Sequence, residues 1–152
     1  MRAFSLCQFL AVPFLTLALV GTVLAADMQT TPVENAQVDD FTAGKSAIDA
    51  KHWSEAVVRF DKVVAKNPKN ADAYNYLGFA NRWLGKYDDA FAAYGKALAL
   101  DPNHRGALQY SGIAYVKTSQ MAKARAQLTQ LQALCANCAE TTELAKAITA
   151  AQ

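Results

Sequence analysis

Residues 71–104 read ADAYNYLGFANRWLGKYDDAFAAYGKALALDPNH, and this stretch decides the fold. Large, small and helix-breaking residues recur in it at the spacing of two amphipathic helices joined by a short turn. The positions that carry the pattern are Tyr74, Leu77, Gly78, Gly85, Tyr87, Ala90, Tyr94, Ala97 and Pro102.

Weaker copies of the pattern lie about 34 residues to either side. The upstream copy, residues 37–70, keeps Gly44, Trp53, Ala56, Phe60 and Pro68 at the corresponding positions. The downstream copy, residues 105–138, keeps Gly112, Tyr115, Met121, Ala124, Leu128 and Leu131, with Ala136 in place of the proline.

These copies resemble tetratricopeptide (TPR) repeats. The resemblance implies an all-α, right-handed superhelix of three helix-turn-helix repeats, 37–70, 71–104 and 105–138, within a domain that spans residues 37–150. A last apolar pattern at about 140–150 predicts a capping helix, because a terminal repeat needs a cover over its open edge. In TPR arrays the first helix of each repeat lines a concave groove, in which extended peptides or helices lie.

The recurring glycines carry a packing prediction. Glycine in a helix interior costs up to about 1 kcal/mol relative to alanine. Its recurrence at Gly44, Gly78 and Gly112 therefore indicates close helix approach, where a Cβ would clash. We expect Phe60, Tyr94 and Leu128 to fill the space opposite, and Ala56, Ala90 and Ala124 to pack closely from the partner helix.

The pattern predicts helices rather than strands, because no segment shows sustained period-two alternation. Ser54, Asn70 and Asp88 are good N-cap residues, and Pro68 and Pro102 end helices. We expect helices at about 38–51, 55–66, 71–84, 88–100, 105–118, 122–134 and 140–150.

The first 25 residues are expected to lie outside the folded domain. Arg2 is followed by a mostly apolar run from Phe4 to Leu24, which ends in small residues before Asp27. This is typical of a secretory signal peptide, and the alternative is an uncleaved membrane anchor. Residues 26–36 are polar and are interpreted as a flexible tether. The chain has no Asn-x-Ser/Thr sequon, so the bacterial periplasm is favoured as its location.

The charge balance bears on the partner. The 152 residues include 15 Lys plus Arg and 13 Asp plus Glu. A nearly neutral chain argues against nucleic acid as the main partner. Contact with a membrane is expected only through residues 1–25, if they remain attached.

Cys135 and Cys138 lie three residues apart and allow several interpretations. In an exported chain a structural disulfide is favoured, and it would pin the turn before the capping helix. A redox motif needs a thioredoxin-like βαβ context, which this sequence lacks. Haem attachment needs a histidine after the second cysteine, and Ala139 stands there instead. Zinc needs two further ligands.

No residue pattern indicates catalysis or a cofactor. The sequence has no phosphate-binding glycine loop and no metalloprotease or hydrolase motif. The acid pairs Asp39-Asp40 and Asp88-Asp89 begin helices, where they serve as caps and dipole partners. His52 and His104 are interpreted as surface turn residues, since no partner group is identifiable in the sequence.

The resemblance places the groove on the first helix of each repeat. The residues there that are not needed between repeats are Phe41, Lys45, Ile48, Asn75, Phe79, Arg82, Trp83, Gln109, Ile113, Val116 and Lys117. Phe79 and Trp83 could equally be core residues, and the three cations could be solvated. Trp and Arg are the residue types that dominate interface energetics.

The best-known TPR groove is the carboxylate clamp for chaperone tails, and this chain fits it poorly. Phe41 stands where the clamp has its first lysine, and Lys45 and Tyr76 stand where it has asparagines. Binding of chaperone tails is therefore not expected.

Three functions compete. The favoured one is a non-catalytic scaffold of the cell envelope that binds a peptide segment or helix of another protein. The second is a self-assembling or membrane-tethered assembly factor, and the third is thiol-disulfide activity at Cys135 and Cys138.

Overall fold

The structure, a computed structural model, describes residues 39–152. That part of the chain holds seven helices and no strand: α1 (Asp40–Asp49), α2 (Trp53–Lys66), α3 (Ala71–Trp83), α4 (Tyr87–Leu100), α5 (Arg105–Lys117), α6 (Met121–Leu134) and α7 (Ala139–Thr149). The expected all-α fold is confirmed, and every expected helix end lies within two residues of the observed one. The expected signal peptide, 1–25, and tether, 26–36, lie outside the described residues.

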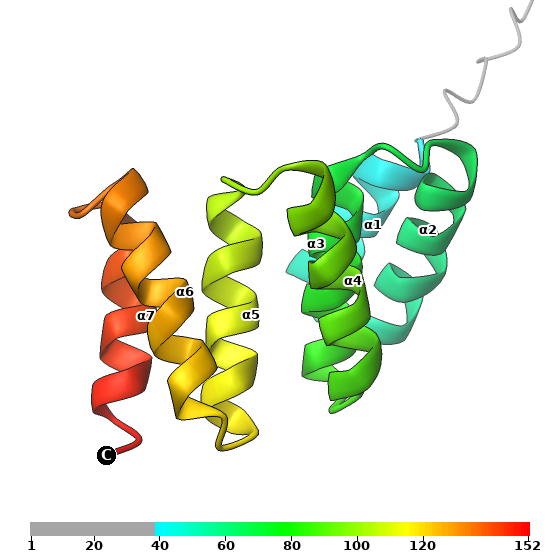
Figure 1. Cartoon of the computed structure of the whole chain (residues 1–152). Coiled ribbons are helices and arrows are strands. Elements are labelled where there is room, and N and C mark those ends of the chain that lie inside the picture. Colours follow the sequence, from blue (N-terminus) through cyan, green and yellow to red (C-terminus); the bar gives the residue numbers. More distant parts are fainter. Residues whose placement is uncertain (1–38) are drawn as a thin grey trace, which may run out of the picture. The chain divides into compact units, whose positions relative to one another are not determined.

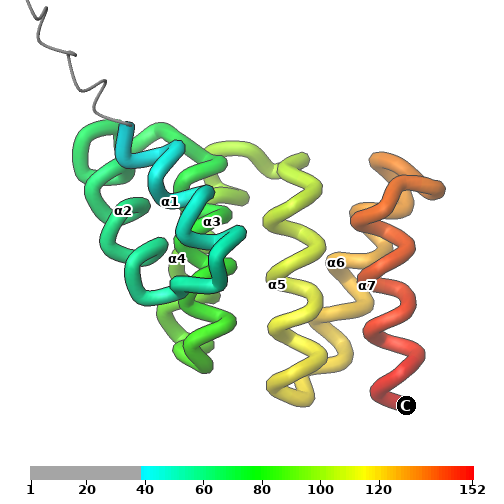
Figure 2. The backbone as a smooth tube through the Cα atoms, turned by 180° about the vertical axis from the view of Figure 1, so that it is seen from behind, coloured from blue at the N-terminus to red at the C-terminus, as the bar shows by residue number. Residues whose placement is uncertain are grey.

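The helices form two layers. Consecutive helices pack as hairpins, α1 with α2, α3 with α4 and α5 with α6, and α7 packs on α5 and α6. In Figure 1 the layer of α2, α4 and α6 faces the viewer, and Figure 2 shows α1, α3, α5 and α7 from the other side. The first helices of successive hairpins therefore line one face, as the TPR resemblance implies.

Glycines allow the close approach between helices. A Cβ on Gly44 would lie 2.8 Å from the Phe60 ring, and one on Gly78 would lie 2.6 Å from the Tyr94 ring. Both contacts are as expected. Gly112 differs, because the nearest side chain is Leu144 of α7 at 2.5 Å, and the expectation for Leu128 was wrong. The capping helix supplies the side chain that fills this place.

The alanines at the recurring close-packing positions are all fully buried. Ala56, Ala90 and Ala124 have no exposed surface. Ala56 lies in the apolar cluster of Phe60, Ala90 lies in that of Tyr94, and Ala124 lies in a third cluster formed by α5, α6 and α7. Small side chains at these positions let α2, α4 and α6 approach their neighbours closely.

Two of the expected N-caps are correct. Asp39 is the N-cap of α1, where its carboxylate accepts hydrogen bonds from the backbone N–H groups of Phe41 and Thr42. The Asn70 side chain accepts a hydrogen bond of 2.9 Å from the backbone N–H of Ala73 and so caps α3. Ser54 and Asp88 lie inside α2 and α4, whose N-cap residues are His52 and Lys86. Those two helices begin one or two residues earlier than expected, with Trp53 and Tyr87 as their first residues.

The three hairpin turns share one backbone conformation. Lys51, Gly85 and Ser119 have φ values of 60°, 74° and 60°, and they are the residues with positive φ in the described part of the chain. Only one of the three is glycine, the residue that takes this conformation without strain. Among residues 39–152, no helix is long and apolar enough to cross a membrane.

Candidate protein-binding surface

Four aromatic rings and one guanidinium gather at the end of α3. We call Trp53, Phe79, Arg82, Trp83 and Tyr110 the aromatic patch. The indoles of Trp53 and Trp83 stack, with centroids 5.2 Å apart and planes at 8°. Phe79 lies edge-on to both indoles and has its ring centroid 4.7 Å from that of Tyr110. The patch therefore joins the first hairpin, α3 and α5 into one surface.

Antiparallel packing brings these residues together. Trp53 is the first residue of α2 and Trp83 is the last residue of α3, and α2 packs against α3. Because the two helices run in opposite directions, the start of one lies beside the end of the other. Phe79 lies one turn before Trp83 on α3 and faces Tyr110 on α5.

Arg82 lies among the rings. Its guanidinium carbon is 5.1 Å from the ring centroids of both Phe79 and Trp83, and 5.9 Å from that of Tyr110. These distances are within the range of cation–π attraction. The Nε of Arg82 is buried and has no hydrogen-bond partner within the described part of the chain. The three rings position the guanidinium of Arg82, but they carry no negative charge that would pair with it.

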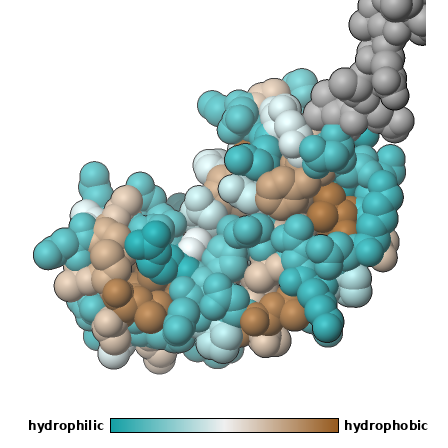
Figure 3. Space-filling model, turned by 90° about the horizontal axis from the view of Figure 1, so that it is seen from above, coloured by the Kyte–Doolittle hydropathy of each residue, from teal (hydrophilic) through white to brown (hydrophobic). Residues whose placement is uncertain are grey.

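Trp83 is the exposed member of the patch. Its exposed fraction is 53%, which is high for an indole that also stacks on a second indole. Viewed from above, the molecule shows apolar residues as small groups between hydrophilic ones rather than as one broad area (Figure 3). Tryptophan and arginine are the residue types that contribute most to binding energy at protein interfaces, so an exposed Trp83 beside Arg82 is typical of an interface anchor.

A hollow of about 190 Å³ adjoins the patch and is lined by α1, α3 and α5. Lys45, Ile48 and Asp49 line it from α1, and Tyr76, Phe79 and Tyr110 line it from the other two helices. Its side chains thus include one cation, one anion and three aromatic rings. The face on which the TPR resemblance places a groove is hollowed there.

Several expected groove residues are engaged in packing. The Phe41 ring lies edge-on to the Phe60 ring, with centroids 5.7 Å apart, and also contacts Tyr76. Ile113 and Val116 pack against the apolar cluster of α5, α6 and α7. These three side chains support the domain and are separate from the aromatic patch.

The polar groove candidates fall into two groups. Asn75 and Gln109 are both buried, and the Gln109 amide donates a hydrogen bond to Glu143 of α7. The Asn75 side-chain oxygen is buried without a hydrogen-bond partner in residues 39–152. Lys45 and Lys117 are exposed. Among the expected groove residues, the patch itself contains Phe79, Arg82 and Trp83.

His104 is not the unpartnered surface residue that the sequence suggested. Its Nδ1 accepts a hydrogen bond of 3.2 Å from the backbone N–H of Ala107, so it caps α5. That contact leaves the proton on Nε2, which donates to Asp72 Oδ1 at 3.0 Å. Because both ring nitrogens are used, His104 has a structural role at the α3–α5 contact. His52 is exposed, as expected.

The two cysteines are free thiols in the structure, so the expected disulfide is not formed there. Cys135 follows α6 in an extended conformation, and Cys138 is the N-cap residue of α7. The Cys138 sulfur lies 3.1 Å from the Cys135 carbonyl oxygen and 3.3 Å from Thr141 Oγ1. These polar contacts hold its side chain toward the turn. In the residues that the structure covers, no group of three or more His, Cys, Asp or Glu side chains is placed to hold a metal ion.

Trp53 and Tyr110 were not predicted as members of the patch. Trp53 was expected only at a repeat position, and Tyr110 was not among the expected groove residues of the third repeat. The one available signal was the antiparallel order of the helices, which places the start of α2 beside the end of α3.

Comparison with known proteins agrees with this architecture. The tetratricopeptide repeat family matches residues 71–104. The peroxisomal targeting signal receptor of Komagataella phaffii is 38% identical over 63 residues, which are 41% of this chain and 11% of the receptor. The Hsp70-Hsp90 organizing protein of Triticum aestivum is 38% identical over 73 residues, or 48% of this chain and 12% of that protein. The chain thus spans about a tenth of the length of these curated relatives.

A solved structure extends the likeness across the helices. The first TPR domain of Spaghetti (RPAP3), bound to the HSP90 peptide SRMEEVD, has a TM-score of 0.67 to this chain. The alignment covers 73% of this chain and 89% of that domain, at 22% sequence identity. At that identity the likeness shows the fold.

Proposed function

The chain carries a tetratricopeptide repeat and folds as TPR domains do, and from this premise we propose that it binds a peptide segment or helix of another protein. The binding surface is the aromatic patch together with the hollow lined by α1, α3 and α5. The RPAP3 domain was solved with a peptide bound, which supports this kind of ligand for the fold.

One observation carries the proposal: Trp83 is half-exposed while it stacks on Trp53 and lies against Arg82. Burying a tryptophan face contributes about 2 to 3 kcal/mol of hydrophobic free energy. Arg82 forms no ion pair with another described residue and its Nε has no hydrogen-bond partner there, so this donor is available to a partner's carbonyl or carboxylate. The patch offers an apolar face and a cation side by side.

The partner differs from a chaperone tail in chemistry. Phe41, Lys45 and Tyr76 stand where a carboxylate clamp has its lysine and asparagines, and Phe41 is packed against Phe60. A surface of aromatic rings around one arginine favours a segment with an aromatic or aliphatic anchor. We therefore expect an anchor residue over the indoles and an acceptor group near Arg82.

Intrinsic fluorescence gives a direct test, because Trp53 and Trp83 are the two tryptophans of the sequence and both lie in the patch. Peptides selected from a random display library would be titrated into the purified protein. A specific ligand should shift the emission, and Trp83→Ala should weaken binding by about tenfold or more. Arg82→Ala should weaken it as well.

Val58→Ala is the matched control, since Val58 is an equally exposed apolar side chain outside the patch. The Val58→Ala protein should bind the selected peptides with the same affinity as the parent protein. Peptides that bind the Trp83→Ala protein as well as the parent would exclude the patch as the binding surface. A dimer in light scattering, combined with no peptide binding, would favour self-assembly instead.

We also propose that the protein works in the cell envelope, most simply the bacterial periplasm. The support is the apolar run from Phe4 to Leu24 and its small-residue ending, which lie outside the described residues. N-terminal sequencing of the chain from a periplasmic fraction tests this. A chain that begins at Met1 and stays with the membrane would establish the anchored alternative.

A further inference from the structure

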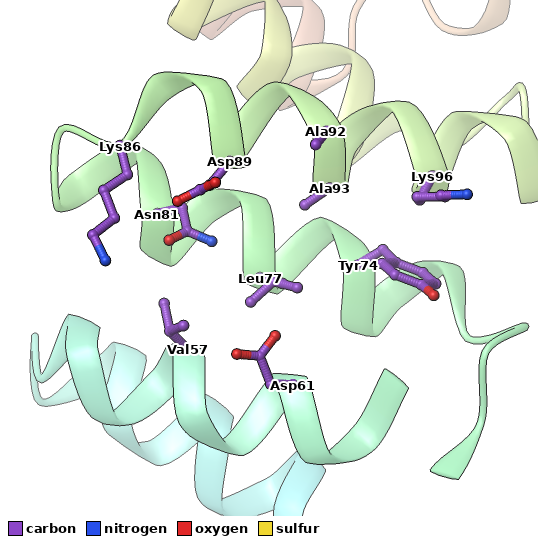
Figure 4. Close-up of a pocket in the computed structure, with 10 residues that line it drawn as sticks. All are labelled: Val57, Asp61, Tyr74, Leu77, Asn81, Lys86, Asp89, Ala92, Ala93 and Lys96. Carbon is purple, nitrogen blue, oxygen red and sulfur yellow. The ribbon is translucent and has the colours of Figure 1, made fainter. Parts of the chain in front are cut away.

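A second cleft lies between α2 and the hairpin of α3 and α4, and it shares no residue with the aromatic patch. Its volume is about 480 Å³. Figure 4 shows side chains of α2 facing those of α3 and α4 across it.

Two carboxylates face the cleft from opposite helices. Asp61 comes from α2 and Asp89 from the first turn of α4. Asp40 is paired with Arg59 and Lys66, but neither Asp61 nor Asp89 has an ion pair or hydrogen bond with another described residue. Burial raises the pKa of the Asp61 carboxyl, and the negative charge of Asp89 raises it further. The charged form of Asp61 is thus disfavoured beside Asp89.

A buried amide lines the same cleft. Asn81 is 5% exposed, and its side chain forms no hydrogen bond with any residue that the structure describes. Figure 4 shows the amide pointing from α3 into the cleft. No atom of this amide is among the buried side-chain atoms that lack a partner, so its polar atoms are accessible from the cleft. Its carbonyl oxygen is available to accept a hydrogen bond from a bound group.

The floor of the cleft is apolar, and its lysines stand at the ends. Val57 and Leu77 face one another across the floor, next to Ala93. Lys86 and Lys96 lie at opposite ends of the row in Figure 4, and the Lys96 ammonium is directed away from the row. The centre of the cleft therefore combines two unpaired carboxylates, an amide and an apolar base.

This combination fits one side chain better than others. Arginine has an apolar stem, which packs along apolar surface, and a charged head. Its planar guanidinium presents five donors and suits recognition by several oxygens at once. We propose that this cleft is a second docking site, which takes an arginine side chain of a partner protein between Asp61, Asp89 and Asn81. The two unpaired carboxylates at the centre of the cleft, between lysines at its ends, favour a cationic side chain as the occupant.

The test uses N-acetyl-arginine methylamide as the probe, titrated into the full ¹⁵N-labelled chain. N-acetyl-citrulline methylamide is the control, because it has nearly the same shape without the charge. We expect saturable shifts of the Asn81 side-chain amide and of the Asp61 and Asp89 backbone amides, with an affinity of about millimolar for so small a probe. The citrulline compound should leave these signals in place.

Variants then assign the binding to the carboxylates. Asp61→Asn and Asp89→Asn should each weaken the probe about tenfold, which corresponds to one charge-assisted hydrogen bond. Both variants should fold, because each removes one of two facing charges. Asp88→Asn is the matched control, since Asp88 lies in the same first turn of α4 but outside the cleft, and its affinity should match the parent.

Several outcomes would overturn the proposal. They are equal shifts with the citrulline compound, unchanged affinity in Asp61→Asn and Asp89→Asn, or shifts confined to the tryptophan indoles. The proposal stands separately from peptide binding at the aromatic patch. Trp83→Ala should leave the arginine probe bound in the cleft, and Asp61→Asn should leave peptide binding at the patch intact.

Discussion

The ring of Tyr94 packs directly on Gly78, so closely that a Cβ on the glycine would lie 2.6 Å from the ring Cε1 atom. Gly78→Ala must therefore displace a fully buried aromatic side chain or part the two helices. We expect a loss of about 1–3 kcal/mol in the free energy of unfolding, the usual cost of overpacking. Chemical denaturation of the two proteins measures it.

Gly95→Ala separates steric from helix-propensity effects. A Cβ at Gly95, in α4, would meet no other atom within 4 Å. Since alanine is favoured over glycine in a helix by up to about 1 kcal/mol, this change should stabilise the protein. Equal effects from the two substitutions would contradict the packing argument.

The shared turn conformation leads to a second prediction. Ser119 has a φ of 60°, a region that costs non-glycine residues about 1 kcal/mol, while Gly85 takes the corresponding place without strain. Ser119→Gly should therefore raise the free energy of unfolding by up to about 1 kcal/mol, partly offset by the entropy of glycine. Gly85→Ala should lower it by about 1 kcal/mol. Thermal unfolding shows both signs, and a destabilised Ser119→Gly would count against strain at this turn.

The repeat pattern predicts the fold well because its signals are local. Glycine, aromatic and proline positions recur at one spacing, and the contacts of Phe60 with Gly44 and of Tyr94 with Gly78 obey it. The spacing fails at Gly112, where Leu144 rather than Leu128 is nearest. The third copy has α7 beside it, and a helix outside the repeat register can supply the side chain that fills its core.

The site was less predictable than the fold. Phe79, Arg82 and Trp83 lie on one helix, so helical spacing alone groups them. Trp53 joins them from thirty residues earlier in the chain, through the packing of α2 on α3. The Asp72 partner of His104 is also distant in sequence and is brought near by the contact of α3 with α5. Such pairs depend on how the helices pack.

The stacked indoles should have a spectroscopic signature. Two indoles 5.2 Å apart couple their transitions, which should give an exciton couplet in far-ultraviolet circular dichroism. Trp53→Phe and Trp83→Phe should each abolish the couplet while the helical bands remain. Trp83→Phe should change stability by less than about 1.5 kcal/mol, since it keeps an aromatic ring at an exposed position. A couplet that survives either change would exclude the stacking.

Two aspartates should affect acid stability in opposite directions. The hydrogen bond from Lys66, and then that from Arg59, hold the pKa of the Asp40 carboxyl below its usual range. A lowered folded-state pKa contributes stability above the unfolded-state pKa, and this is lost as the pH falls through the folded value. Asp40→Asn should therefore destabilise the protein at neutral pH and flatten the acid side of its stability curve.

Asp61→Asn should do the reverse. Because the folded-state pKa of Asp61 is raised, its contribution is present below the unfolded-state pKa and is lost as the pH rises through the folded value. Removing the charge should then stabilise the protein at neutral pH relative to acid pH. Denaturant midpoints measured across the pH range compare the two variants. Parallel curves for both variants would contradict the assigned shifts.

The cysteine turn gives a prediction about export. The thiol of Cys135, and next the hydroxyl of Thr141, lower the pKa of the Cys138 thiol, so Cys138 should be the first to react with an alkylating reagent. In a chain exported to an oxidising compartment we expect the Cys138 thiolate to attack a disulfide oxidant of that compartment, and Cys135 then to displace the oxidant in its reduced form as the Cys135–Cys138 disulfide closes. The stabilisation is about 2 kcal/mol in the chain-entropy model for so short a loop. Closure requires the Cys138 sulfur to leave its contacts with the Cys135 carbonyl and Thr141. A thiol titration of denatured, processed protein from the periplasm should find neither Cys135 nor Cys138 free. Cytoplasmic protein should show both as free thiols, together with Cys7 where residues 1–25 remain attached. Two free thiols in the periplasmic protein would rule the disulfide out and leave the turn held by its hydrogen bonds alone.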